Sequence, residues 1–140
     1  MSVNDGINKA AREWRAANRE RDRKTRLRHD RAHPESRMLA NAKNRATGKG
    51  WDYDLTPAWA QEKLQKGICE VTGIPFDFER GTVNAHNPFR PSIDRRDTSL
   101  GYTQNNCQIV VVAYNQAKGT WSHADVLKLA KALVTKEVIE

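Results

Sequence analysis

Positive charge in this chain is concentrated in its first third. Lysine and arginine outnumber aspartate and glutamate by 14 to 5 between Lys9 and Gly50, whereas the counts are 10 and 11 from Trp51 to Glu140. Large apolar residues are few in the basic part, and their spacing forms no continuous stripe along a helix. A hydrophobic core must therefore come from the later part, so we expect a basic arm over residues 1–50 and one small domain over residues 51–140.

The arm is rich in helix-forming residues, and we expect it to be helical in pieces, ordered mainly by a partner or by the following domain. A net charge of +7 and a pI near 9.7 favour a polyanionic partner, with nucleic acid as the first choice. A solvated basic tail with no specific role is the alternative. The residues predicted to contact nucleic acid are Arg19, Arg21, Arg23, Lys24, Arg26, Arg28 and Arg31.

Composition also excludes several protein classes. No apolar run approaches the roughly 18–20 residues that span a bilayer, and the N-terminus carries no apolar signal segment. We expect a cytoplasmic protein without a membrane partner. Two cysteines, Cys69 and Cys107, are too few for a disulfide scaffold or a four-cysteine zinc site.

The later part alternates helix and strand signals. Thr56 and Pro57 are typical of a helix start and Gly67 of its end. Residues 68–76 predict a small hairpin or knuckle, and residues 92–95 and 107–112 predict two strands. One or two helical turns over 113–118 and a final helix capped by Ser122 follow. The pattern predicts an α+β fold.

A set of ordered motifs runs through these elements. Pro91-Ser92-Ile93-Asp94-Arg95 is followed by Gly101-Tyr102-Thr103, by Asn106 and by Ala113-Tyr114-Asn115-Gln116-Ala117-Lys118. Together they resemble the core of the HNH endonucleases, especially small phage-type members, over roughly residues 55–130. The resemblance implies a ββα hairpin that clasps one divalent metal, flanked here by helices, and a bacterial host cytoplasm if the protein is phage-encoded.

By this resemblance, Asp94 and Asn115 would hold the metal, and Asn106 would fix the connecting loop through backbone hydrogen bonds. The chemistry is reasonable by itself, because a carboxylate and an amide oxygen are hard ligands suited to Mg²⁺ or Mn²⁺. Alternatives stay open for both ligands. Asp94 could instead pair with a neighbouring arginine, and Asn115 could be a capping or core amide.

The chain departs from the HNH pattern at Arg95, where the family has its general-base histidine. A guanidinium only donates hydrogen bonds, so Arg95 could bind phosphate or stabilise the transition state but could not accept a proton. His86 is the histidine nearest in sequence to Asp94 and is the candidate base, with a bystander role as the alternative. Metal-bound water without a protein base is a further option.

The cysteines admit two interpretations. Cys69-x-x-Thr72-Gly73 looks like the zinc knuckle of the family with its second cysteine replaced. Two cysteines without a nearby histidine argue against structural zinc, so buried, inert side chains are the better interpretation.

Three functions therefore compete. The first is a metal-dependent DNA endonuclease or nickase, in which Asp94, Arg95 and His86 act on the scissile phosphate. The second is a non-catalytic nucleic-acid-binding protein on a degenerate HNH fold, favoured by Arg95. The third is a phage-encoded interaction protein whose arm wraps an acidic protein or RNA. We prefer the first; a homodimer is open, since no feature of the sequence specifies one.

Overall fold

The computed structural model describes residues 3–79 and 87–139. The chain forms two compact units, Met1–Pro34 and Glu35–Glu140, each with most of its contacts internal. The described residues form five helices and two strands. In chain order they are α1 (Val3–Ala32), α2 (Pro34–Lys49), α3 (Pro57–Lys66), β1 (Pro91–Arg95), β2 (Cys107–Val111), α4 (Val112–Lys118) and α5 (His123–Ile139).

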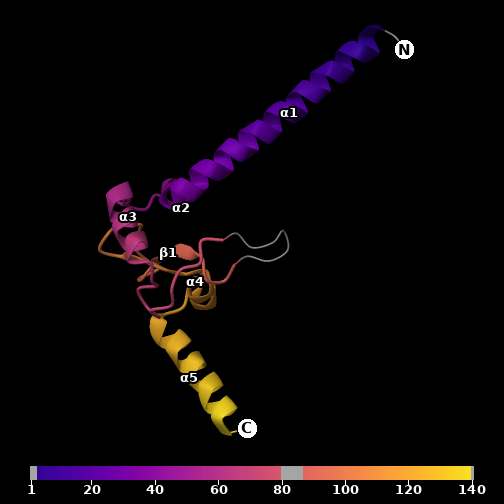
Figure 1. Ribbon diagram of the computed structural model, residues 1–140. Coiled ribbons are helices and arrows are strands. Elements are labelled where there is room, and N and C mark those ends of the chain that lie inside the picture. The colour runs from indigo at the N-terminus through magenta and orange to yellow at the C-terminus, as the bar shows by residue number, and fades with distance from the viewer. Residues whose placement is uncertain (1–2, 80–86, 140) are drawn as a thin grey trace. The chain divides into compact units, whose positions relative to one another are not determined.

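Helix α1 is one uninterrupted helix (Figure 1), and the region predicted to be helical in pieces consists of two helices, α1 and α2, that are separated at His33. It ends next to His33, because the residue before a proline disfavours the helical conformation and Pro34 opens the next helix. None of the side chains described in α1 is buried. The predicted absence of an apolar stripe therefore corresponds to a helix with no core of its own.

Helix α2 packs into the second unit, although the sequence prediction placed it in the arm. Leu39, Ala42 and Ala46 belong to the buried core, and their spacing puts them on one face of the helix. The compact units accordingly divide at Pro34 and not at residue 50. Large apolar residues are the stronger sequence signal of a packing face, whereas in α2 small alanine side chains form much of it.

Helix α3 has the ends that its sequence predicts. Thr56 accepts a hydrogen bond at its side chain from the backbone nitrogen of Trp59, at 3.2 Å, with Pro57 in the first turn. Gly67 ends the helix in the left-handed region, with φ 73°. The predicted knuckle follows, closed by an antiparallel bridge between Ile68 and Pro75.

The centre of the second unit is an antiparallel hairpin followed directly by a helix. Strand β1 pairs with β2, with Asp94 opposite Gln108 and Ile93 opposite Ile109, and α4 begins one residue after β2 ends. All five residues of β2 are buried, as its β-branched composition predicts. The protein therefore has the predicted α+β fold with a ββα centre.

A second long-range connection ties the loop before β2 to the segment after α2. Tyr53 and Tyr102 form a parallel bridge, in which the Tyr102 nitrogen donates to the Asp52 carbonyl at 2.9 Å. Gly101 lies against the Asp52 backbone so closely that a Cβ atom there would collide with it. Only glycine allows this approach.

Helix α5 extends from the second unit with no buried residue. Its start follows the prediction, because Ser122 Oγ accepts a hydrogen bond from the Asp125 nitrogen at 3.2 Å. Across the part of the chain that the structure describes, no helix combines the length and apolarity needed to cross a membrane.

Candidate functional site

Asp94 forms a buried ion pair with Lys118. The Lys118 Nζ lies 2.8 Å from Asp94 Oδ1, and the two side chains are 1% and 3% exposed. Strand β1 presents Asp94 toward α4, whose last turn carries Lys118. The alternative to a metal-binding role for Asp94 was an ion pair with a neighbouring arginine. The structure instead pairs Asp94 with a lysine 24 residues away. Removal of either partner would leave an uncompensated buried charge.

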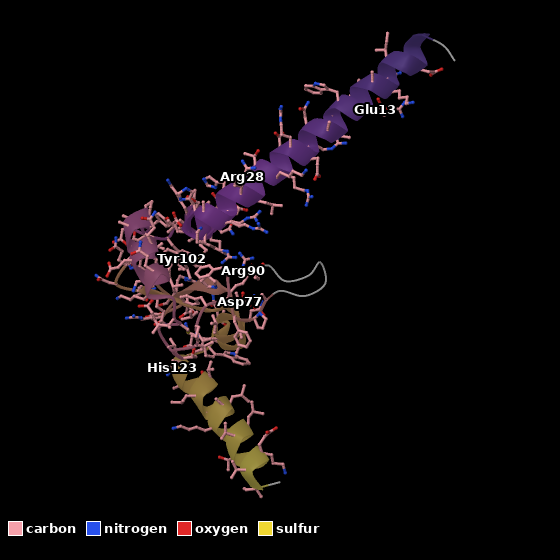
Figure 2. The ribbon with its side chains drawn as sticks, viewed as in Figure 1. Glu13, Arg28, Asp77, Arg90, Tyr102 and His123 are labelled. Atoms are coloured by element: carbon pink, nitrogen blue, oxygen red, sulfur yellow. The ribbon has the colours of Figure 1, made fainter. Side chains whose placement is uncertain are left out.

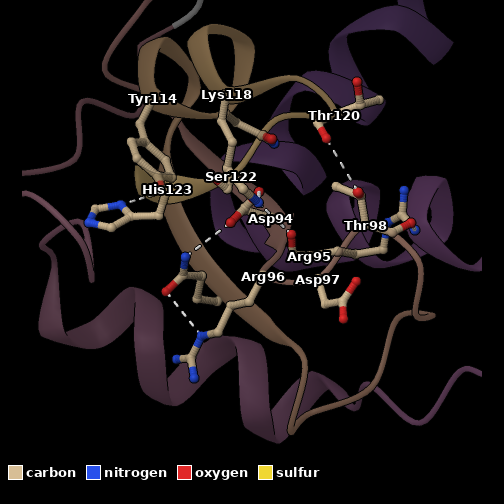
Figure 3. A network of polar contacts seen from close by, with 12 residues as sticks. Asp94, Arg95, Arg96, Asp97, Thr98, Tyr114, Lys118, Thr120, Ser122 and His123 are labelled. Atoms are coloured by element: carbon tan, nitrogen blue, oxygen red, sulfur yellow. Dashed lines mark hydrogen bonds and ion pairs between the residues drawn. The ribbon is translucent and has the colours of Figure 1, made fainter. Parts of the chain in front are cut away.

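The ion pair is part of a longer polar network (Figure 3). Lys118 Nζ also donates to the carbonyl oxygen of Arg95 at 2.6 Å. Gln108 Nε2 donates to Asp94 Oδ2 at 3.0 Å, and Arg96 Nε donates to Gln108 Oε1 at 3.2 Å. Both carboxylate oxygens of Asp94 are therefore engaged, and the network reaches solvent at Arg96, which is exposed.

The expected Mg²⁺ or Mn²⁺ site must be tested against these contacts. The oxygens of Asp94 and of the Arg95 carbonyl do converge on one cation, but that cation is the Lys118 ammonium. A divalent ion on the same oxygens would face a buried like charge, at a distance where repulsion is strong. Among the described residues, no three His, Cys, Asp or Glu side chains gather. The residues as arranged do not fit a divalent ion.

Arg95 lies on the opposite side of β1 from Asp94 and is held within the protein. Its guanidinium carbon is 3.9 Å from the Trp51 ring centroid, and its Nη1 donates to the carbonyl oxygens of Thr98 and Leu100 at 2.7 and 2.8 Å. These contacts fit a residue that joins the loop to the aromatic core. The predicted contact with phosphate stays a prediction.

Asn106 closes the loop between the strands. Its Oδ1 accepts from the Asp97 nitrogen at 3.0 Å, and its Nδ2 donates to the carbonyl oxygens of Asp97 and Gly101 at 3.0 and 2.9 Å. Within the same loop, hydrogen bonds from the Ser99 hydroxyl and backbone nitrogen hold the pKa of Asp97 below its usual value. The Asn106 side chain thus fixes the loop through hydrogen bonds to backbone groups.

Asn115 ties α4 to β1. Its Nδ2 donates to Ser92 Oγ at 2.8 Å and to the Ile93 carbonyl at 3.1 Å. Among the described residues, no donor reaches the amide oxygen of Asn115. The structure therefore brings Asp94 and Asn115 onto one hairpin-and-helix unit, and Asn115 acts there as a structural amide.

Tyr114 and His123 form a second polar pair beside the network. The Tyr114 hydroxyl lies 2.9 Å from His123 Nδ1. Burial, with the nearby Asp94 carboxylate, raises the pKa of the Tyr114 phenol. A protonated phenol can donate to a bare Nδ1, which places the imidazole proton on Nε2, or accept a hydrogen bond from Nδ1–H.

Three candidate residues remain, namely His86 and the two cysteines. His86, the candidate base, lies outside the described residues. Cys69 and Cys107 are both buried free thiols, and Cys69 Sγ accepts a hydrogen bond from the Val111 nitrogen at 3.4 Å. Burial raises the pKa of the Cys107 thiol to about 12.

Sequence reasoning missed most of the polar network. The HNH-like motif includes Lys118 without predicting its contact with Asp94, and it does not include His123. Gln108 stands within an apolar run at the position that faces Asp94 across the hairpin. A buried polar residue opposite another is a signal that strand pairing could have supplied.

The predicted nucleic-acid contacts all lie on α1. Arg19, Arg21, Arg23, Lys24, Arg26, Arg28 and Arg31 are exposed, and Figure 2 shows side chains projecting along the whole helix. Arg23 pairs with Glu20 at 3.0 Å, a surface contact that leaves its charge accessible. The helix presents an exposed basic surface.

Comparison with known proteins agrees with this architecture. No family model matches the sequence, and no curated protein matches it. A solved structure of the rare-cutting HNH restriction endonuclease PacI, studied for its perturbation of DNA, is similar in fold, with a TM-score of 0.51 and 20% identity. The similarity covers 71% of this chain and 75% of PacI. The protein therefore has an HNH-like α+β fold.

Proposed function

We propose that this protein binds DNA and hydrolyses its phosphodiester backbone, as an endonuclease or nickase. The observation that carries the proposal is the β1–β2–α4 unit. It places Asp94 on the first strand, closes the loop with Asn106 and bonds Asn115 back to the strand. The same order of residues is the one that resembles the HNH core, and PacI, an HNH endonuclease, is similar in fold.

The basic surface of α1 supports DNA as the partner. Arginines on one exposed helix neutralise phosphates and release counterions, which gives affinity without sequence preference. Arg96 lies next to the ion pair and is exposed. Its Nε donates to Gln108, and its terminal guanidinium nitrogens are suited to donate to an anionic phosphate. Positive charge at the scissile phosphate stabilises the charge that develops during hydrolysis.

A non-catalytic DNA-binding protein is the second candidate. The Lys118–Asp94 ion pair favours it, because both oxygens of the proposed metal ligand already have partners. Arg95, at the position of the general base, is likewise occupied by loop carbonyls. On this view, the chain keeps the HNH-like fold and the basic helix for binding alone.

A plasmid-nicking assay separates the two. Supercoiled plasmid is incubated with the protein in EDTA, in Mg²⁺ and in Mn²⁺, and DNA binding is measured in parallel by gel shift. Endonuclease function predicts relaxed or linear plasmid in at least one condition. Binding at every condition with intact plasmid would establish the second candidate.

Two variants assign any cleavage to the site. Asp94→Asn keeps the shape of the side chain but leaves the buried Lys118 without its anion, so nicking is measured on protein whose circular dichroism is native, and there we expect nicking to be lost. Lys131→Gln on α5 removes one exposed positive charge far from β1 in sequence and should nick as the unaltered protein does. Nicking that survives in purified Asp94→Asn would point to another site or to a contaminating nuclease.

A further inference from the structure

A cavity of about 390 Å³ opens beside the Asp94–Lys118 pair. It is lined by Val71, Arg96, Gln108, Tyr114, Lys118 and His123, which come from the knuckle, the hairpin, α4 and the first residue of α5. Its volume lies within the range of about 300–1,000 Å³ typical of ligand sites. The HNH-like motif accounts for neither Arg96 nor His123.

The charges around this cavity are predominantly positive. The Asp94 carboxylate is neutralised by Lys118 and shielded behind it at 3% exposure. Arg96 uses its Nε on Gln108, and among the described residues no carboxylate pairs with its guanidinium. Its terminal nitrogens are therefore available for a bidentate contact with an anion.

His123 adds a second donor. When the Tyr114 hydroxyl donates to Nδ1, 2.9 Å away, the neutral imidazole carries its proton on Nε2. Protonation of the ring would leave Nε2 with its hydrogen, so this atom donates in either state of the imidazole. In this arrangement, His123 presents a hydrogen-bond donor to an anion in the cavity. Figure 3 shows its ring beside Tyr114 and on the same side of the hairpin as Arg96.

We propose that this cavity binds a phosphate group, held by the Arg96 guanidinium and by His123 Nε2. Tyr114 is a positioning residue that fixes the imidazole tautomer. The group could come from the nucleic-acid backbone or from free phosphate, and only the backbone source rests on the proposed function. In the backbone case, the cavity holds a phosphate through residues of the second unit, in addition to the phosphate contacts expected of α1.

Inorganic phosphate is the first probe. The ring signals of His123 are assigned by NMR through their loss in His123→Gln, and phosphate is then titrated with chloride as the reference anion. We expect the His123 signals to move, with Nε2 protonated in the nitrogen spectrum. Arg96→Gln should weaken phosphate binding about tenfold or more, since a charged hydrogen bond is lost. Lys131→Gln, which removes one exposed charge elsewhere, should bind phosphate as the unaltered protein does.

Two results would overturn the proposal. One is a set of His123 signals that phosphate leaves unchanged, and the other is equal phosphate affinity in Arg96→Gln and Lys131→Gln. Tyr114→Phe gives a further check, because loss of the hydroxyl should let the imidazole exchange between tautomers while circular dichroism stays native. An imidazole with the proton on Nδ1 in the unaltered protein would contradict the role given to Tyr114.

A short DNA duplex distinguishes the sources. If the backbone supplies the phosphate, the duplex competes with inorganic phosphate at His123, and Arg96→Gln lowers the salt dependence of DNA binding by about one phosphate contact. If DNA binds without disturbing His123, the cavity takes free phosphate. A protein that binds phosphate here but neither binds nor cuts DNA would refute the proposed function and leave this site standing.

Discussion

Helix α1 and the β1–β2–α4 unit both depend on charged side chains but use them in opposite ways. On α1 the guanidinium groups are exposed, and the salt bridges, such as Lys9 with Glu13, lie at the surface. In the hairpin unit, Lys118 and Asp94 are almost fully buried and neutralise each other's charge. Exposed charge remains available to a partner, whereas buried charge is committed to the fold.

This difference changes what a substitution measures. A change on α1 should alter binding and leave stability intact, because α1 contributes no buried side chain among the described residues. A change in the buried network should alter stability first. The presence of an arginine or a lysine does not by itself indicate a role in DNA binding in this protein. Whether the side chain is buried or exposed decides if it supports stability or binding.

The largest expected effect comes from neutralising α1. Glutamine at all seven predicted contact positions should weaken DNA binding by at least about 10³-fold at moderate salt and flatten the salt dependence, since the released counterions are lost. Fluorescence anisotropy over a range of salt concentrations measures both. The residues to change are Arg19, Arg21, Arg23, Lys24, Arg26, Arg28 and Arg31.

The control is Lys128→Gln with Lys131→Gln on α5, which tests whether any loss of positive charge has the same effect. Equal salt slopes in the seven-fold variant and the unaltered protein would show that α1 serves another partner.

Breaking the buried ion pair comes next. Lys118→Met leaves the Asp94 carboxylate buried without its cation, and we expect a loss of about 3–5 kcal/mol in the free energy of unfolding. Urea denaturation followed by circular dichroism gives the value. The double variant Lys118→Met with Asp94→Leu removes both charges and should recover much of the loss, because two apolar side chains need no partner. If the single and double variants are equally unstable, packing and not charge explains the effect.

Substitution of one arginine in each region tests the difference between buried and exposed charge directly. Arg95→Ala removes the stacking on Trp51 and the hydrogen bonds to Thr98 and Leu100, so we expect a loss of about 2 kcal/mol in stability. DNA affinity should change little. Arg26→Ala on α1 should do the reverse, with weaker DNA binding and an unchanged urea midpoint.

The same substitution thus has opposite consequences in the two regions. Loss of DNA binding in a folded Arg95→Ala would instead support the phosphate contact first predicted for Arg95.

The smallest expected effect concerns the surface pair on α1. Hydrogen bonds and charge from Arg23 lower the pKa of Glu20, yet both groups are exposed. Glu20→Gln should therefore leave the urea midpoint of the protein unchanged within error, because surface ion pairs contribute little. A measurable loss would mean that the exposed charges on α1 also support the fold.

Local signals accounted for much of the fold. The Thr56, Pro57 and Gly67 positions mark both ends of α3, and the β-branched run marks β2. Such signals act within a few residues, so a sequence displays them directly. The boundary between the units was misplaced because the alanines of α2 gain their importance only from the surface on which they pack.

The candidate site was less accessible to sequence reasoning. Asp94 and Asn115 could be named from the motif, but the partner that occupies Asp94 lies 24 residues away on another element. Arg95 meets Trp51 across a still longer separation. Contacts of this kind depend on the tertiary fold, and no local pattern states which of several cations reaches a buried carboxylate.

The bridge between Tyr53 and Tyr102 has a consequence for the order of folding. The two strands and α4 are near one another in sequence, so their pairing closes only short loops. The bridge instead joins segments about 50 residues apart, and so does the hydrogen bond from the Gln104 nitrogen to Asp54 Oδ1. Closure of so long a loop costs chain entropy before its contacts are gained. We expect the hairpin to be formed in the folding transition state and the Tyr53 segment to dock afterwards, with substitutions at Tyr53 acting mainly on the unfolding rate.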